Sequence, residues 1–480
     1  MPNRREFLQG LAAASAGVSL IGGVDAATSR PKGSKDSVRK ILIRGGYVVT
    51  MDRTLGDLET GDVLIDSGKI AAVGKDLPAQ GAQVVNAKSK LVLPGFIDTH
   101  RHTWETCLRG VLADGDFPMY FKIILGTLGP LYRPEDVYIG NLLGSLGCLN
   151  SGITTLLDWS HIMNTPEHAD AAIKGLKDSG IRGVFGHGDA VTSWLKPQND
   201  QRHIEDIKRI QKQYFSSDDQ LLTLAMAVAG PEFFTLEATI DDIKLAREMG
   251  IRISMHVGVP GVARFRAVTK LKEAGVLGPD ITHIHTLHCT DDELKMIADS
   301  GGSISTSPAT EIISGHGFPS VQRWLRYGLR PSISVDNETR IPPDLFTQMR
   351  ALLSSDRELE TIRVAKEGGR PTLLPTRDVL EFATVQGARA TGLDRKVGTI
   401  APGKRADVIL IDLDDVAVIP RIKDPVGTAL LIAHPGNVSW VFVDGIVRKR
   451  EGKLVGVDMD KVRKDAQGSY EYLYAKAGLR

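Results

Sequence analysis

Two histidines separated by one residue, His100 and His102, follow an apolar run in the stretch PGFIDTHRHTWE, residues 94–105. On a β-strand, side chains at positions i and i+2 point to the same face, so both imidazoles can reach one metal ion. Pairs of this kind also occur by chance, and the pair alone is a weak indication. Its meaning depends on which other ligand side chains the fold brings to the same place.

The middle of the chain, residues 95–394, alternates short apolar strands with helical patterns, as parallel β/α units do. Several of the helical segments end in glycine, a common C-terminal stop. The candidate strands are LVLPGFIDTH, GITTLLDWSH, GVFGHGDA, LLTLAMAVAG, IRISMHVG, ITHIHTL, GSISTSP and PSISVDNE. Eight such units in about 300 residues predict an α/β fold, a (β/α)8 TIM barrel.

Potential ligands and acid–base groups gather where these strands end, which is where the active site of such a barrel lies. Six of the 12 histidines in the chain fall at these ends, more than random placement would put there. The groups at strand ends are His100, His102, His161, His187, Asp189, Glu232, His256, His285, Glu311 and Asp336.

A third histidine and a carboxylate from facing strands would join His100 and His102 in a site with three nitrogen ligands and one oxygen ligand. Such a site suits one Zn²⁺ or Fe²⁺ ion and leaves one position for water. The ion lowers the pKa of that water from ~15.7 to ~7, and the resulting hydroxide can attack an sp2 carbon. We expect Asp336 to orient and deprotonate the water, and His285 to hydrogen-bond to the water or to the developing oxyanion.

Other polar and aromatic residues near the strand ends are candidates for substrate contact or proton transfer. Each has an equally weighted alternative: a polar loop residue without a catalytic part for Glu311 and His316, pocket lining for His161 and His187, and core packing for Trp104. They are Glu311, His316 in SGHGFP, His161, His187 and Trp104.

Both ends of the chain are rich in short strands separated by turn signals. Residues 41–94 alternate apolar and polar side chains, which predicts an antiparallel β-layer, and residues 395–455 repeat this texture. We expect the two segments to form one small composite β-sandwich beside the barrel, followed by a C-terminal tail, residues 456–480.

The N-terminal stretch NRREFLQGLAAASAGVSLIGGVDAATS resembles a twin-arginine export signal, with two adjacent arginines before a weakly apolar run. Small residues near Ala26 fit a cleavage site, which predicts a signal peptide over residues 1–27 and a linker over 28–40. The chain is therefore expected to be exported to the periplasm or secreted. The apolar run is too short and glycine-rich for a stable membrane span, which needs ~20 apolar residues.

The overall composition excludes some classes of function. The chain has 59 Lys and Arg against 58 Asp and Glu, so it lacks the basic excess of a nucleic-acid-binding protein. Three cysteines do not make a disulfide framework. The expected partner is a small-molecule substrate.

Three motifs carry a resemblance to the amidohydrolase superfamily, in the branch of cytosine deaminase, S-adenosylhomocysteine deaminase and the triazine hydrolases. They are PGFIDTHRH, SGITTLLD and EFATVQGARATGLDRKVGTIAPGKRADVILID, and the similarity spans residues 40 to 450. The resemblance implies a mononuclear metal site, most readily Zn²⁺, and a homodimer is common in that family. By motif position the ligands would be His100, His102, His256 and Asp336, with His285 assisting catalysis.

One position departs from the deaminases of this branch, which carry His-x-x-Glu on the fifth strand. Here the third residue after His256 is Val259. Ammonia is a poor leaving group unless it is protonated, so loss of this acid matters. Three interpretations stay open: hydrolysis of an amide, cyclic imide, ester or lactone; deamination of an amino-heterocycle with Glu311 or His316 in place of the glutamate; and metal or ligand binding with little catalysis.

Overall fold

The computed structural model describes residues 40–196, 203–420 and 423–479. The predicted signal peptide and nearly all of the predicted linker lie outside these residues. Within the described part of the chain, no helix is both long and apolar enough to cross a membrane.

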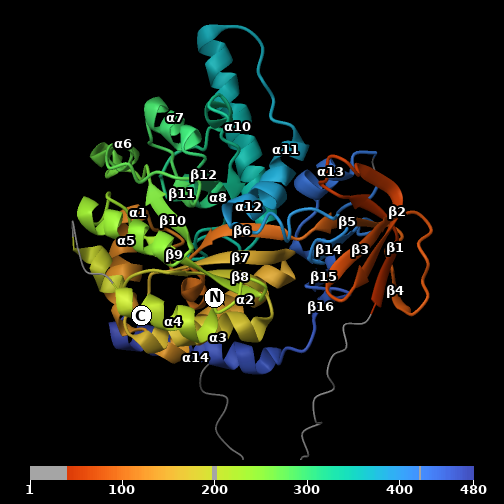
Figure 1. Ribbon diagram of the computed structural model, residues 1–480, viewed down its shortest axis with the longest axis horizontal. Helices are drawn as coiled ribbons and strands as arrows, with labels where there is room; N and C mark the ends of the chain where they lie inside the picture. Colours follow the sequence, from red (N-terminus) through yellow and green to blue (C-terminus); the bar gives the residue numbers. More distant parts are fainter. Residues whose placement is uncertain (1–39, 197–202, 421–422, 480) are drawn as a thin grey trace, which may run out of the picture. The chain divides into compact units, whose positions relative to one another are not determined.

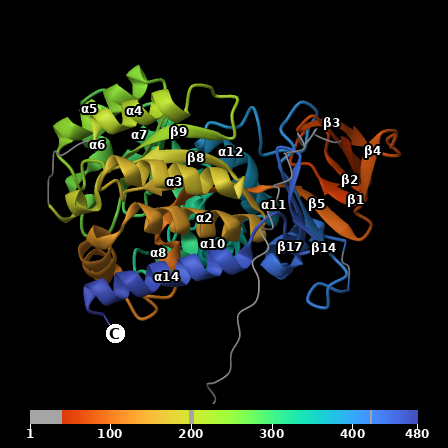
Figure 2. The ribbon, with the colours of Figure 1, turned by 90° about the horizontal axis from the view of Figure 1, so that it is seen from below.

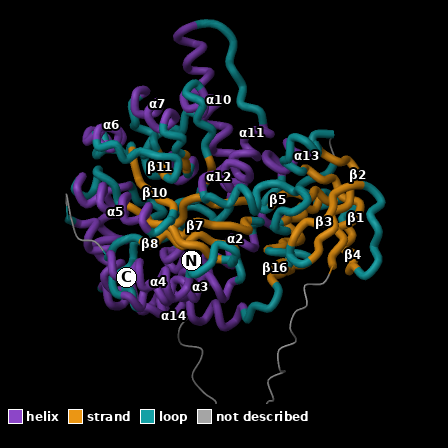
Figure 3. The backbone as a smooth tube through the Cα atoms, viewed as in Figure 1, coloured by secondary structure: helices purple, strands orange, loops and turns teal. Residues whose placement is uncertain are grey.

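The middle of the chain forms the predicted barrel, and all eight expected strands are present in sequence order (Figures 1 and 3). Neighbouring strands pair in parallel from the first to the last. The strands are β6 (Phe96–Arg101), β7 (Ile153–Ser160), β8 (Arg182–His187), β9 (Leu222–Val228), β10 (Arg252–Val257), β11 (Ile281–His285), β12 (Ser303–Thr306) and β13 (Ser332–Ile333).

Helices follow the strands and cover the outside of the barrel (Figure 1). Their ends carry the expected signals: α7 begins with a Thr290–Glu293 capping box, and α3 ends at Gly180 with a φ of 72°. The helices of this layer are α2 (Pro134–Asn150), α3 (Pro166–Ser179), α4 (Ile204–Tyr214), α5 (Leu236–Glu248), α6 (Ala267–Glu273), α7 (Asp291–Asp299), α8 (Pro308–Ile313), α9 (Val321–Leu325), α10 (Leu345–Glu367), α11 (Thr376–Glu381) and α12 (Gly387–Ala390).

Strands from both ends of the chain form a second sheet beside the barrel (Figure 2). The expectation of an antiparallel layer is wrong in one respect. The sheet is mixed, because β1 pairs with β4 and β5 in parallel and with β2 antiparallel. Its strands are β1 (Lys40–Val49), β2 (Asp57–Asp66), β3 (Lys69–Gly74), β4 (Ala82–Asn86), β5 (Lys90–Pro94), β14 (Val408–Asp412), β15 (Val438–Val443), β16 (Ile446–Arg450) and β17 (Lys453–Leu454).

The N-terminal and C-terminal halves of this sheet share one apolar core. Ile43 and Val63 from the first half cluster with Leu410 and Phe442 from the second. The predicted C-terminal tail contains a helix, α14 (Met459–Ala477), which packs against α2 on the barrel (Figure 2).

The barrel closes between β6 and the chain that follows β13. A parallel bridge joins Arg101 to Asp336 at this seam. The Arg101 side chain is fully buried and forms ion pairs with Asp98, at 2.7 Å, and with Glu338, which also pairs with Arg109. A carboxylate oxygen of Asp98 accepts a hydrogen bond from the backbone N–H of Val335 at 3.1 Å. The buried charges therefore connect the first strand of the barrel to the last.

We predict that Arg101→Met lowers the free energy of unfolding by about 3–5 kcal/mol, because it leaves the buried carboxylate of Asp98 without a cation and Glu338 with Arg109 alone. The measurement is urea denaturation together with the metal content of the purified protein, which should also fall. Arg182→Met is the matched control, since Arg182 forms an equally buried ion pair with Asp407 where β8 begins. It should be similarly destabilised but keep its metal. A loss below about 1 kcal/mol in Arg101→Met would show that the seam does not depend on this charge.

Candidate active site

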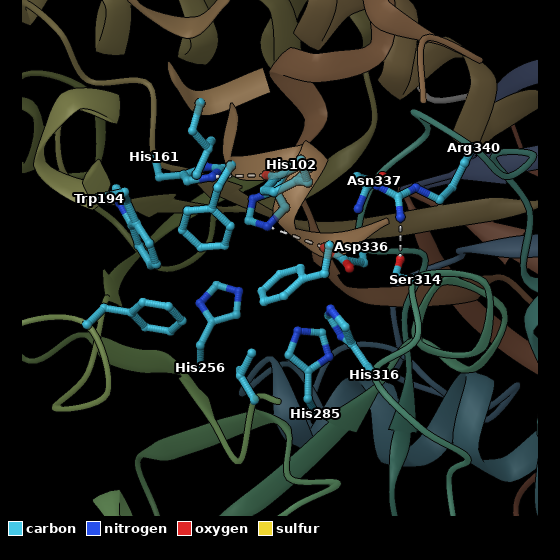
Figure 4. Close-up of a pocket in the computed structure, with 16 residues that line it drawn as sticks. His102, His161, Trp194, His256, His285, Ser314, His316, Asp336, Asn337 and Arg340 are labelled. Atoms are coloured by element: carbon cyan, nitrogen blue, oxygen red, sulfur yellow. Dashed lines mark hydrogen bonds and ion pairs between the residues drawn. The ribbon is translucent and has the colours of Figure 1, made fainter. Parts of the chain in front are cut away.

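Side chains from four places in the barrel meet at the carboxyl ends of the strands (Figure 4). His100 comes from β6 and His102 directly follows it, His256 comes from β10, His285 from the last position of β11, and Asp336 from the chain after β13. Ligand atoms of His100, His102 and Asp336 lie within 4.8 Å of one another, and so do those of His100, His256 and His285. His100 is common to both groups, so the five side chains surround one small volume.

Two distances between donor atoms are those expected around a tetrahedral metal ion. Oδ1 of Asp336 lies 3.3 Å from Nε2 of His100 and 3.3 Å from Nε2 of His102. An ion with bonds of about 2.0–2.1 Å holds its ligand atoms about 3.3–3.4 Å apart. Nδ1 of His102 donates to the backbone oxygen of Trp159 at 2.9 Å, which directs the lone pair of Nε2 to the site.

Buried nitrogens without partners support the same interpretation. Among the described residues, neither ring nitrogen of His100 has a hydrogen-bond partner, and Nδ1 of His256 has none. Leaving buried polar atoms unpaired costs about 1–3 kcal/mol each, so an unsatisfied pair on one ring calls for a ligand. A metal ion bonded to one nitrogen of each ring accounts for one of the two on His100 and for the one on His256.

The protonation states also suit a cation. Burial lowers the pKa of His100 and His256, and it lowers the pKa of His102 to about 3. Burial alone would raise the pKa of Asp336, but its close contact with the His100 ring outweighs this effect and lowers it. Three neutral imidazoles and one carboxylate therefore face each other at neutral pH. This cluster is a site for a divalent metal ion.

His285 and Asp336 both have backbone conformations that non-glycine residues rarely adopt. Their φ angles are 72° and 71°, in the left-handed region. Such conformations cost about 1–3 kcal/mol each and persist only where surrounding contacts impose them. For Asp336 these contacts are backbone hydrogen bonds at the barrel seam: its N–H donates to His100 at 2.9 Å, and its carbonyl oxygen accepts from the N–H of His102 at 2.7 Å.

His285 is held from behind by a fully buried carboxylate. Its Nδ1 donates to Glu311 at 2.9 Å, and Glu311 also accepts from the hydroxyl of Thr306 at 2.6 Å and the N–H of Ser307 at 2.9 Å. Burial lowers the pKa of His285, but the hydrogen bond and charge of Glu311 outweigh burial and raise it. The other ring nitrogen of His285 remains for the cavity.

A second group of polar side chains lies beside His102. His161 accepts a hydrogen bond at Nδ1 from the indole of Trp104 at 3.2 Å, and its Nε2 lies 3.3 Å from the hydroxyl of Tyr120. That hydroxyl donates to Glu105 at 2.6 Å. Burial raises the pKa of Glu105 well above its usual range. The group fixes the ring of His161 at the cavity wall.

The cavity over the metal ligands has a mainly aromatic and apolar wall (Figure 4). Polar groups other than the histidines are concentrated near Asp336. The apolar side chains are Phe117, Phe121, Leu125, Trp194, Phe233 and Val259, and the polar ones include Ser314, Asn337 and Arg340. Of the described residues that line the cavity, Asp336 is the only one with a carboxylate.

The residues predicted from sequence fall into three sets in the structure: those that line the cavity, those buried behind its lining, and His187, which lies elsewhere. Those that line the cavity are His102, His161, His256, His285, His316 and Asp336. His100, Trp104 and Glu311 are buried directly behind this lining.

His187 belongs to a different place. It lines a separate small pocket with Asp189 and His203, and its Nε2 bonds to Asp206 on α4 at 2.9 Å. The expectation that it contacts substrate is not supported by this placement, because the ring turns outward to the helix layer.

Sequence reasoning missed Arg340 and Asn337, which line the cavity four residues and one residue after Asp336. Their proximity to Asp336 in the sequence was a usable signal. It also missed the aromatic wall, which comes from α1 (Phe117–Met119), a π-helical segment at Tyr120–Leu128, a short turn at Val191–Leu195 and, with Phe233, the chain after β9. These segments carry no motif.

Comparison with known proteins agrees with the fold and the ligand set. Residues 91–447 match the model of the amidohydrolase family, and the chain belongs to that family. It is a metal-dependent hydrolase that acts on carbon–nitrogen bonds other than peptide bonds.

Relatives match over nearly their whole length. A 5'-deoxyadenosine deaminase of Methanosarcina mazei is 27% identical over 448 residues, 91% of this chain and 99% of the relative. A 5-methylthioadenosine/S-adenosylhomocysteine deaminase of Pyrococcus furiosus is 25% identical, over 88% and 98%.

Two solved structures have the same fold. A triazine hydrolase from Arthobacter aurescens superposes with a TM-score of 0.81 and 22% identity, over 90% of this chain and 99% of its own. An adenosine deaminase from Xanthomonas campestris with bound zinc has a TM-score of 0.79 and 21% identity, over 91% and 99%.

We predict that His102→Ala lowers the metal content of the purified protein at least about 10-fold, because it removes one of four ligands. The measurement is metal per chain by mass spectrometry after dialysis against a weak chelator. His187→Ala is the matched control, a buried histidine at another strand end, and should keep its metal. Equal metal content in the two variants would contradict the assigned ligand set.

Proposed function

We propose that the protein hydrolyses an amide or cyclic amide bond of a small substrate whose body is aromatic or otherwise apolar. The observation that carries this proposal is the single carboxylate, Asp336, among the described residues of the cavity wall. Val259 stands where related deaminases carry the glutamate of His-x-x-Glu, and its side chain is buried against the cavity.

The ligand set His100, His102, His256 and Asp336 would hold one divalent ion, and we propose zinc. The zinc named with the Xanthomonas campestris structure supports this choice. When bound, the ion would supply Lewis acidity and lower the pKa of a water molecule to ~7.

The chain's own residues can carry out the proton transfers that amide hydrolysis requires. One proton must leave the attacking water and one must reach the departing nitrogen, so a single carboxylate can carry it from one to the other. Asp336 is ionised and faces the cavity, which suits this role. The free ring nitrogen of His285, oriented by Glu311, bonds to the substrate oxygen that gains negative charge.

Ring deamination requires a second proton transfer. The heterocycle must gain a proton on a ring nitrogen as well as on the departing amine, and in the related deaminases the glutamate supplies the ring proton. The nearest other buried carboxylates are engaged elsewhere: Glu311 with His285, Glu105 with Tyr120, and Glu232 with the backbone N–H groups of the Val259 loop at 2.8 and 3.1 Å.

Deamination of an amino-heterocycle is the second candidate. It is favoured by the relatives, which are named deaminases of 5'-deoxyadenosine, 5-methylthioadenosine and S-adenosylhomocysteine. In that case His316 would replace the glutamate. It lines the cavity beside His285, and neither of its ring nitrogens has a partner among the described residues.

The two candidates are separated by assaying zinc-loaded protein against N-acyl amino acids and cyclic imides, and in parallel against 5'-deoxyadenosine, adenosine and amino-triazines. We predict turnover of a member of the first group and ammonia release at least about 100-fold slower from the second, since the ring acid is missing. Asp336→Asn should abolish turnover, and Asp206→Asn, outside the cavity, should retain it. Faster ammonia release by the native enzyme would overturn the proposal in favour of deamination.

We also propose that the chain is exported by the twin-arginine route, on the strength of Arg4 and Arg5 and the apolar run that follows. A double substitution, Arg4→Lys with Arg5→Lys, is predicted to leave the protein in the cytoplasm, measured by fractionation of the producing cell. The unaltered chain should reach the periplasm or medium with residues 1–27 removed. Export that is unaffected by the double substitution would contradict this route.

A further inference from the structure

One cation stands in the cavity wall without an acidic partner. Arg340 lines the cavity on the loop after Asp336, and Nη1 donates to the hydroxyl of Ser314 at 2.9 Å (Figure 4). Its Nε is buried and has no hydrogen-bond partner among the described residues. Among the described residues no carboxylate forms an ion pair with its guanidinium, and Asp336 is the acid whose charge acts on it first, from beyond that distance.

The neighbouring arginines behave differently. Arg101 and Arg109 both pair with Glu338, two residues before Arg340 in the sequence. Glu338 is therefore already paired with two arginines at the barrel seam. Arginine stays charged in proteins, and the half-buried guanidinium of Arg340 has no direct ion pair, although the charge of Asp336 acts on it from a longer distance. A carboxylate on a ligand would give it a direct partner.

A second donor lies beside Arg340. Oδ1 of Asn337 accepts hydrogen bonds from the N–H of Thr339 at 3.3 Å and from its hydroxyl at 2.6 Å. This fixes the orientation of the amide and leaves Nδ2 as the polar atom for the cavity that Asn337 lines. Two groups of hydrogen-bond donors thus stand on one side of the cavity, whereas Phe117, Phe121 and Phe233 belong to its apolar wall.

We propose that the substrate carries a carboxylate that Arg340 binds, with Asn337 as a neighbouring donor. This inference rests on the proposed hydrolysis and narrows its substrate class to acidic amides with an aromatic or apolar body. A carboxylate matches the charge and the planar fork of one guanidinium. Arg340 then determines specificity and orients the scissile bond relative to the metal ligands.

The test uses two inhibitors that bind the metal through a hydroxamate. Both are phenylacetohydroxamic acids, one with a carboxylate and one with a carboxamide at the para position of the ring. Zinc-loaded protein should bind the carboxylate probe at least about 10-fold more tightly, the size of one charge-assisted hydrogen bond. Calorimetry measures both dissociation constants.

Arg340→Gln should remove this preference and leave binding of the carboxamide probe unchanged, which also shows that the variant is folded and holds zinc. Arg340→Lys should keep part of the preference. Arg53→Gln, at a side chain 89% exposed, is the matched control and should keep all of it.

Equal binding of the two probes by the native protein, or a preference that survives Arg340→Gln, would overturn the role of Arg340 while leaving the proposed hydrolysis intact. Failure of both hydroxamates to bind zinc-loaded protein would instead refute the metal centre, and the inference with it.

Discussion

The seam between β6 and the chain after β13 is the contact on which the site depends. Asp336 bonds through its backbone to His100 and His102, and its carboxylate meets the rings of the same two histidines. Closing the barrel and assembling the metal ligands are thus a single event. A shift of this seam by one residue would turn Asp336 away from the cavity, because side chains alternate along a strand.

The same alternation explains the residue between the two histidines. In the sequence His-Arg-His the histidines share the cavity side, so Arg101 must point the other way, into the protein. A buried guanidinium there is tolerable only because Asp98 and Glu338 surround it, and Arg109 balances the second acid. The Asp of the PGFID motif is therefore structural: it holds Arg101 and the backbone of Val335.

The barrel and the ligand histidines were predictable from sequence because both follow from local patterns. Strand periodicity locates the strand ends, and strand ends in a parallel barrel share one face. The contact between His285 and Glu311 was not predictable, since it depends on the left-handed turn at His285 and on how α8 returns over the barrel. For His187 the sequence pattern was right about the strand and wrong about the ring. His187 ends β8 as the pattern predicted, yet its ring bonds to Asp206 on a helix outside the cavity.

Arg340 and Val259 show why membership of the family does not by itself determine the chemistry of the cavity. Both lie in loops after strands, where the path of the chain is set by contacts distant in sequence. The loop carrying Val259 is shaped by Glu232, whose carboxylate binds the N–H groups of Gly258 and Val259 and so holds an acid behind the wall instead of in the cavity. The barrel shared with the deaminases fixes where a metal and one carboxylate stand. In this chain the loops place Val259 and Arg340 in the cavity wall, so the strands position the metal ligands and the loops determine which carbon–nitrogen bond the site accepts.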